Sequence, residues 1–221
     1  MSYRGLILDF GGVVTTDLYA EMSAFCVREG LAPDAVVRVL RDTAEGREAI
    51  KAVEAGTISQ RDYEITVGRL LGVDDRGLLI RALAGLRPRP ETLELIQRAR
   101  SAGIRVALLS NSWGDSEYDP YDGYDLDAMF DTVVISGETG MRKPDPTIYL
   151  VTADKLGIPP QECVFADNTA ANLPAASTPA VDRDLVAEAP RTIGRAGETD
   201  LRQRGRPSLL RLPESADGGN P

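Results

Sequence analysis

Short apolar runs along the chain alternate with longer segments of mixed character. Four runs have the apolar composition and polar or glycine boundaries of buried strands: 6–8, 104–109, 132–135 and 163–166. Two of the intervening segments, 92–102 and 146–156, carry apolar residues at helical spacing and are each followed by a glycine. Strands and helices that alternate in this way predict an α/β fold, a doubly wound parallel sheet.

A long segment of helical character separates the first strand from the rest of the predicted sheet. Glycines follow several of its amphipathic stretches, where helices would end. Ser59 and Asp62 have the spacing of a capping box, with Asp in place of the usual Glu. We therefore expect residues 16–86 to form a small helical unit inserted into a core of residues 1–15 and 87–176.

The last segment, 177–221, differs in composition from the rest. It contains neither an aromatic residue nor a lysine, and its acidic and basic residues are equal in number. Only 178–181 and 208–212 have strand-like composition. We expect this tail to be poorly ordered. The sheet would then lack a fifth strand, and an exposed edge beside 163–166 would favour homo-oligomers.

Charge and cysteine content narrow the function classes. The 221-residue chain has a formal net charge of −9, which disfavours a general role in nucleic-acid binding. It has no apolar run long enough to span a membrane, and its start lacks a signal-peptide pattern. Cys26 and Cys163 lack metal-ligand spacing, so we expect reduced, buried thiols in a cytoplasmic protein.

The chain contains no histidine. This absence excludes Ser-His-Asp and Cys-His catalysis, and it also excludes zinc bound through histidine. A nucleophile or base must therefore be a carboxylate, a lysine, a hydroxyl or a thiol. A metal bound only through oxygen atoms would most naturally be Mg²⁺.

Polar side chains follow three of the predicted strands at the point where each strand ends. Asp9 ends the first strand, Ser110 and Asn111 end the second, and Asp167 ends the last. Lys143 lies in a proline-rich turn before a predicted helix. The carboxyl ends of parallel strands are where α/β folds place their chemistry, so these residues are candidates for one site.

Taken together, and with two glycines after the first acid, these segments resemble the haloacid dehalogenase (HAD) superfamily. The segments stand in the family's order and at plausible separations, over roughly residues 4–176, and the subgroup they resemble is similar to the amino-terminal phosphatase domain of soluble epoxide hydrolases. The resemblance implies a HAD-like, Rossmann-like core in which residues 16–86 form a helical cap.

The resemblance also implies a mechanism. Asp9 would be the nucleophile that forms an aspartyl-phosphate, and Lys143 would orient it and neutralise charge. Mg²⁺ would be the cofactor, with Asp9, the Gly11 backbone carbonyl and Asp167 as its ligands.

The implied substrate is a small phosphorylated metabolite, bound by Ser110, Asn111 and Gly12. Two departures from the family pattern bear on its turnover. Gly11 stands where typical phosphatases carry a second Asp as general acid. The lack of such an acid lowers the rate by a factor on the order of 10²–10⁴. Asn168 stands where a second acid is common in the last motif, which would lower metal affinity.

These departures keep other functions open. A catalytically impaired relative that acts as a binding or interaction protein is one alternative. A dehalogenase-like hydrolase is another, because a halide leaves without a proton and so does not need an acid at Gly11. Carbon–phosphorus cleavage would need a cap lysine, but Lys51 lies near Glu48 and Glu54, as expected of a solvated helix face.

Segment 112–127 is polar, aromatic and acidic, which is typical of an exposed loop. Trp113, Tyr118, Tyr121 and Tyr124 lie within it. These rings would either line a substrate entrance or pack the loop against the core.

Overall fold

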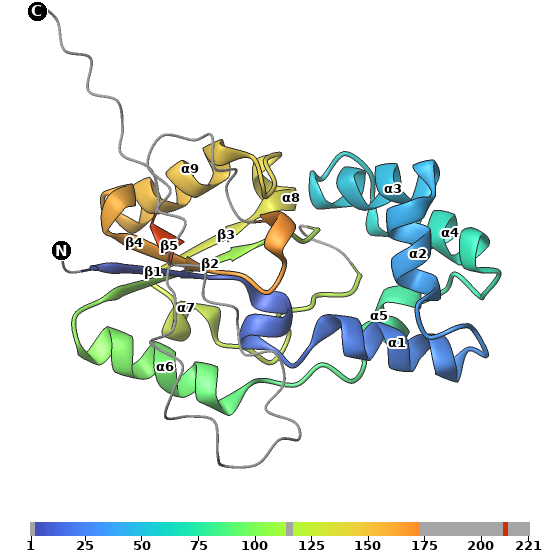
Figure 1. Ribbon diagram of the computed structural model, residues 1–221, viewed down its shortest axis with the longest axis horizontal. Coiled ribbons are helices and arrows are strands. Elements are labelled where there is room, and N and C mark those ends of the chain that lie inside the picture. Colours follow the sequence, from blue (N-terminus) through green and yellow to red (C-terminus); the bar gives the residue numbers. More distant parts are fainter. Residues whose placement is uncertain (1–2, 114–116, 173–209, 212–221) are drawn as a thin grey trace, which may run out of the picture.

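A sheet with four parallel strands forms the centre of the molecule (Figure 1). The computed structural model describes residues 3–113 and 117–172, and the backbone of 210–211. The parallel strands are β1 (Gly5–Leu8), β2 (Arg105–Ser110), β3 (Thr132–Ile135) and β4 (Cys163–Ala166). The order is β3-β2-β1-β4-β5, and Leu8 pairs with Leu108 and Ala166. The carboxyl ends of β1, β2 and β4 therefore lie side by side.

One short strand corrects the sequence-based expectation for the sheet edge. Leu210–Arg211 forms β5, which pairs antiparallel with Val164 and Phe165 of β4. The prediction of a sheet without a fifth strand was therefore wrong, because this edge is paired over two residues. The rest of the predicted tail lies outside the described residues.

Helices cover both faces of the sheet (Figure 1). Helix α9 (Pro146–Leu156) packs on one face, where Ile7, Leu109 and Ile148 are buried. Two helices cover the other face: α6 (Pro90–Ser101) and α7 (Leu126–Met129). Pro146 begins α9 and Gly157 ends it in the left-handed conformation, as the sequence predicted. Three short elements complete the core: α8 (Ser136–Thr139), η2 (Pro160–Glu162) and η3 (Ala170–Asn172).

Five helices between β1 and α6 pack around a hydrophobic core of their own, which forms the cap (Figure 1). They are α1 (Leu18–Arg28), α2 (Ala35–Asp42), α3 (Ala44–Glu54), α4 (Gln60–Leu71) and α5 (Leu78–Leu83). The predicted capping box of Ser59 and Asp62 is present at the start of α4. Cys26 and Cys163 are buried, free thiols. Of the helices in the described ranges, none is long and apolar enough to cross a membrane.

The chain enters and leaves the cap at one point. After β1 it turns through η1 (Phe10–Val14), in which Gly11 and Gly12 have non-helical backbone angles, as expected of a tight turn at these two glycines. Gly12 adopts φ +88° in this turn, and a Cβ there would lie 2.1 Å from Nδ2 of Asn168. Thr15 then forms an isolated antiparallel bridge with Pro88, where the chain returns to the core.

The segment after β2 is less exposed than its composition suggested. In the part that the structure describes, Ser112 and Tyr121 are buried, and Leu126 already begins α7. Tyr121 and Tyr124 pack edge-on against Phe10. Trp113 and Tyr118 contact the core of the cap. Of the two alternatives for the rings, the structure shows packing of the loop, because these large apolar surfaces fill the junction between core and cap, while much of the loop backbone between them is exposed.

Candidate active site

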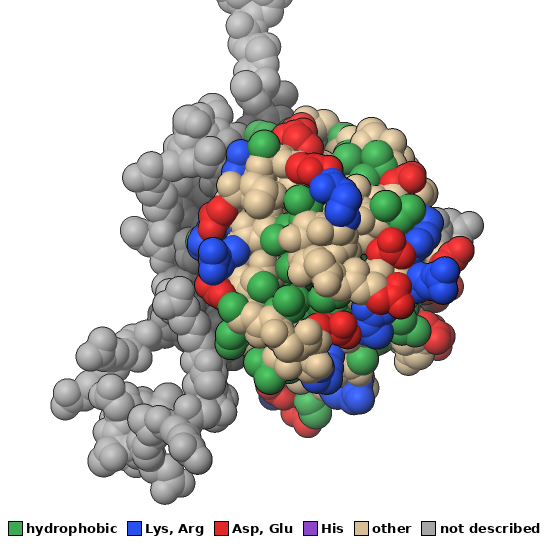
Figure 2. All heavy atoms as spheres, turned by 90° about the vertical axis from the view of Figure 1, so that its right-hand side faces the viewer, with side chains coloured by type: hydrophobic (Ala, Val, Ile, Leu, Met, Phe, Trp, Pro, Cys, Tyr) green, Lys and Arg blue, Asp and Glu red, His purple; other side chains and the backbone are tan. Residues whose placement is uncertain are grey.

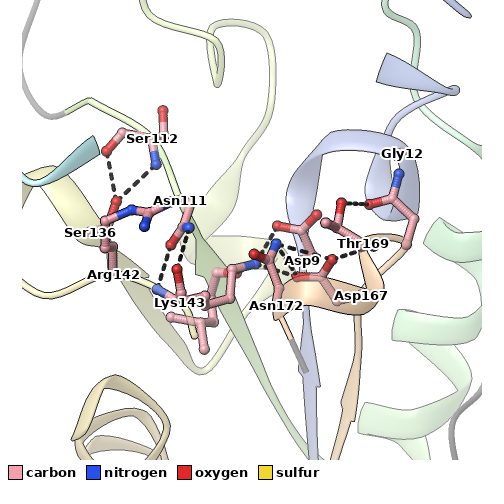
Figure 3. A network of polar contacts seen from close by, with 12 residues as sticks. Asp9, Gly12, Asn111, Ser112, Ser136, Arg142, Lys143, Asp167, Thr169 and Asn172 are labelled. Atoms are coloured by element: carbon pink, nitrogen blue, oxygen red, sulfur yellow. Dashed lines mark hydrogen bonds and ion pairs between the residues drawn. The ribbon is translucent and has the colours of Figure 1, made fainter. Parts of the chain in front are cut away.

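Lys143 lies at the centre of the predicted site and is fully buried (Figure 3). Its Nζ donates to Asp9 Oδ1 at 2.7 Å, to Asp167 Oδ2 at 2.6 Å and to the Leu109 carbonyl at 3.0 Å. An ammonium group has three donors, so all of them are used. Acids at the ends of β1 and β4 are thus joined by one cation, as their positions after adjacent parallel strands allow.

Two buried carboxylates face this single ammonium group, which leaves one negative charge uncompensated. Burial raises the pKa of Asp9 to about 6; Lys143 opposes this rise and Asp167 adds to it. Burial alone would lower the pKa of Lys143, but the charges of Asp9 and Asp167 outweigh burial and raise it. The lysine therefore stays protonated while Asp9 is poised to accept either a proton or another cation.

Asp167 is held by neighbours in its own turn. Its Oδ1 accepts a hydrogen bond from the Thr169 backbone N–H at 2.7 Å. The Asn172 side-chain amide donates to Oδ2 at 3.1 Å. Asn172 was not among the predicted site residues, although it belongs to the same motif. Asn168, in the position where a second acid was considered, lies with its amide against Gly12 instead.

Asn111 holds the lysine turn through its backbone (Figure 3). Its Oδ1 accepts from the Lys143 N–H at 2.8 Å, and its Nδ2 donates to the Lys143 carbonyl at 3.0 Å. Both polar atoms of a residue predicted to bind substrate therefore position Lys143 in this structure. The N–H of Gly12, also predicted to bind substrate, donates to Thr15 Oγ1 at 3.0 Å.

The remaining predicted residues lie at the same edge of the sheet. Ser110 ends β2 and is buried. Gly11 follows Asp9 by two positions in η1, with φ −71°. The structure thus brings together Asp9, Lys143 and Asp167 by direct contact.

An ion pair that the sequence analysis did not predict joins the cap to the site. Oε2 of Glu54, at the end of α3, accepts from Nε of Arg142 at 2.8 Å and from Nη2 at 2.6 Å. Burial raises the pKa of Glu54, and Arg142 opposes the rise. Close by, Gly56 lies so near the Gly137 carbonyl that a Cβ would come within 2.3 Å of it. Cap and core therefore meet tightly, one residue away from Lys143.

The oxygen atoms at this edge of the sheet bear on the metal that the resemblance implies. Among the described residues, no cluster of three or more His, Cys, Asp or Glu side chains is arranged to hold a metal. Two carboxylates with one excess negative charge are nevertheless compatible with a hard divalent cation that completes its shell with backbone oxygens and water. Asp9 and Asp167 could therefore hold Mg²⁺, and the Gly11 carbonyl stays the third ligand that the resemblance implies.

Two curated relatives represent different activities. (S)-2-haloacid dehalogenase 4A of Burkholderia cepacia is 32% identical over 120 residues, which is 54% of this chain and 50% of the relative. The match therefore spans half the length of that enzyme. Phosphoserine phosphatase of Thermus thermophilus is 30% identical over 175 residues, 74% of this chain and 70% of the relative.

A solved structure has the same fold. A HAD family enzyme from Bacteroides thetaiotaomicron, in complex with magnesium and inorganic phosphate, has a TM-score of 0.58 at 22% identity. It covers 77% of this chain, and the match includes 87% of that chain. The profile of haloacid dehalogenase-like hydrolases matches residues 3–178. The chain therefore belongs to the haloacid dehalogenase-like hydrolase family.

Proposed function

We propose that this hydrolase is a Mg²⁺-dependent phosphatase that acts on a small phosphorylated metabolite through an aspartyl-phosphate. The observation that carries the proposal is the buried ion pair of Asp9 with Lys143 at 2.7 Å, at the carboxyl end of β1. A carboxylate held in this way is both charged and oriented for attack. The narrower likeness to the phosphatase domain of soluble epoxide hydrolases stays a prediction.

The chemistry divides between the residues that meet at this edge. An Asp9 oxygen attacks phosphorus, the bond from phosphorus to the leaving oxygen breaks, and water then hydrolyses the acyl phosphate. Lys143 offsets the negative charge that gathers around Asp9. The Ser110 hydroxyl, which ends the adjacent strand, donates a hydrogen bond to a phosphoryl oxygen. Mg²⁺, when bound, reduces the repulsion between the carboxylate and the phosphate oxygens.

Gly11 restricts the substrate. The chain has no side chain at this position to protonate a leaving alkoxide, so a substrate with a stable leaving group is favoured. We therefore expect acyl phosphates and aryl phosphates to react faster than simple alkyl phosphates.

A panel of phosphorylated metabolites, assayed for phosphate release with Mg²⁺ and with EDTA, tests this proposal. We expect Mg²⁺-dependent release from at least one member, and none from the Asp9→Asn variant. Release that persists in Asp9→Asn would exclude the covalent mechanism. Phosphate release unaffected by EDTA would exclude the metal.

A second candidate is dehalogenation of a 2-haloacid. It is favoured by Gly11, because a halide leaves without a proton, and by Lys143, whose ammonium group pairs with both acids and leaves one negative charge for the nucleophile. Halide release from 2-chloropropionate in EDTA, lost in Asp9→Asn, would support it over the phosphatase.

A further inference from the structure

Gln60 is a buried polar residue of the cap that the proposed mechanism does not use. It begins α4, and only 8% of it is exposed. Its Oε1 accepts a hydrogen bond from the Tyr118 N–H at 3.0 Å. Buried side-chain amides in native proteins have hydrogen-bond partners, and this partner belongs to the segment after β2. The contact therefore ties the cap to a loop of the core.

Glu64 holds the other end of the Gln60 amide. The two residues are one helical turn apart on α4, so their side chains lie on the same face. Gln60 Nε2 donates to Glu64 Oε1 at 3.4 Å, and the same oxygen accepts from the Leu79 N–H at 3.0 Å. Only 2% of Glu64 is exposed. A carboxylate accepts and a backbone N–H donates, so the Gln60 amide can face its two partners in one orientation only.

The line of contacts continues from Tyr118 to Trp113. Nε1 of Trp113 donates to the Tyr118 carbonyl at 2.9 Å, and the two ring centroids are 6.3 Å apart. Both rings pack against the core of the cap. Trp113 also lines a hollow of about 560 Å³ together with Gln60 and Gly137. The indole therefore has room to rotate when its hydrogen bond is lost.

The residues just before Trp113 have their partners in the core instead. Ser110 pairs with Ile135 of β3, and Asn111 binds the Lys143 backbone. The Ser112 N–H donates to Ser136 Oγ at 3.0 Å. Cap and core thus hold adjacent parts of one loop, and the change from one to the other falls beside the candidate site.

We infer that Gln60 is a positioning residue that holds the cap in register with the loop after β2, and that it thereby sets how tightly the enzyme binds its substrate. Ser110 and Asn111 keep their core partners without it, so the chemical step is left intact. Loss of the contact favours an undocked cap, and a substrate that needs the docked cap then binds more weakly. The kinetic part of this inference rests on the proposed phosphatase function.

Gln60→Met tests the inference, because it keeps the length of the side chain and removes both polar atoms. We expect KM for the best substrate of the phosphate-release panel to rise about three- to fivefold, as for one lost hydrogen bond. In the same assay kcat should change less than about 1.5-fold, because the lost interaction is not specific to the transition state. Gln97→Met is the matched control, since Gln97 is exposed on α6, and it should change neither quantity.

The fluorescence of Trp113 gives a readout that needs no substrate. Trp113 is the one tryptophan of the chain, so the emission spectrum reports on this loop alone. In Gln60→Met the emission maximum should move to longer wavelength and quenching by iodide should increase, because the indole turns toward solvent. The spectrum of Gln97→Met should match that of the wild type.

An exchange of the two α4 side chains distinguishes the hydrogen bonds from simple packing. Gln60→Glu alone sets two buried carboxylates against each other and should raise KM as Gln60→Met does. Gln60→Glu combined with Glu64→Gln again provides one amide and one carboxylate, with acceptors for the N–H groups of Tyr118 and Leu79. This double variant should return KM and the emission maximum toward their wild-type values.

Two outcomes would overturn the positioning role: an emission maximum unchanged in Gln60→Met, or a double variant no better than Gln60→Glu. A fall in kcat with KM unchanged would overturn the assignment of Gln60 to substrate binding. Wild-type protein that releases no phosphate from any member of the panel would instead overturn the phosphatase proposal and the effect on KM with it. The emission spectra would then still decide whether Gln60 holds the loop.

Discussion

Glu54 and Arg142, 88 positions apart in the chain, are joined by two hydrogen bonds to one carboxylate oxygen. The pair is the described ion pair that links the cap to the loop carrying Lys143. Figure 2, which shows the cap side of the molecule, displays acidic and basic side chains interspersed over this face. Most ion pairs on such a surface contribute little to stability. The Glu54–Arg142 pair differs because its carboxylate is largely buried, with 14% of the side chain exposed.

Arg142→Ala should therefore destabilise the protein by about 1–3 kcal/mol, because it leaves the buried Glu54 carboxylate without a partner. Urea denaturation at pH 7.5 measures this loss. Arg4→Ala is the control, since Arg4 and Glu162 form a pair that is largely exposed, and it should cost less than about 1 kcal/mol. Equal effects of the two substitutions would contradict a special role for the cap contact.

Asp9→Asn should abolish turnover yet stabilise the metal-free protein at neutral pH. Burial raises the pKa of Asp9 from 3.8 to about 6, so the folded state binds more protons than the unfolded state between these values. Stability of the wild type then falls as pH rises from about 4 to 6, by at most about 3 kcal/mol. The Asn variant lacks this loss. In EDTA, the melting temperature of Asp9→Asn should be higher than that of the wild type at pH 7.5, and the two should be equal near pH 4.

Lys143→Met should be strongly destabilising, by about 3–5 kcal/mol, because two buried carboxylates would face each other without a cation. Lys51→Met is a matched control, since Lys51 lies on an exposed helix face and pairs with Glu48. It should change the free energy of unfolding by less than about 0.5 kcal/mol. Chemical denaturation of both variants tests the contrast. A small loss of stability in Lys143→Met would mean that the two acids are not both ionised.

Gly11→Asp should raise the turnover of simple alkyl phosphates, by a factor of about ten or more, because it restores an acid for the leaving oxygen. The backbone at Gly11 suits any L-residue, and a Cβ would meet Leu18 Cδ2 at 3.3 Å, a contact that the flexible leucine can relieve. Gly11→Ala controls for the added Cβ. A gain shared by both variants, or seen in neither, would count against the missing acid as the limit on rate.

The sequence predicted the parallel strands, and the meeting of the acids that follow them, because both follow from local patterns. Asp9 and Asp167 end apolar runs, and parallel strands bring their carboxyl ends to one edge. The role of Lys143 was implied by the resemblance; the structure shows its contacts with both acids, and the role itself stays a prediction. Asn111 was predicted to bind substrate. Its contacts with the Lys143 backbone depend on how two loops distant in sequence are placed relative to each other, which no local pattern encodes.

Other features depend on contacts distant in sequence. In the sequence, Glu54 and Arg142 each resemble an ordinary surface charge. Only the packing of the cap on the core shows that they form a pair. Tyr121 lies in a polar segment, and only the neighbouring Phe10 shows that its ring is buried. The strand β5 has two residues, too few for an alternating pattern to be visible.

Arg142 and Lys143 are consecutive residues that face opposite partners, one in the cap and one in the catalytic centre. A ligand that parted Glu54 from Arg142 would act on the residue that directly precedes Lys143, whose Nζ contacts Asp9. A change in this contact between cap and core is therefore also a change in the loop that carries Lys143. Variants of Arg142 and of Asn111, which binds the Lys143 backbone, would therefore act on one loop from its two sides.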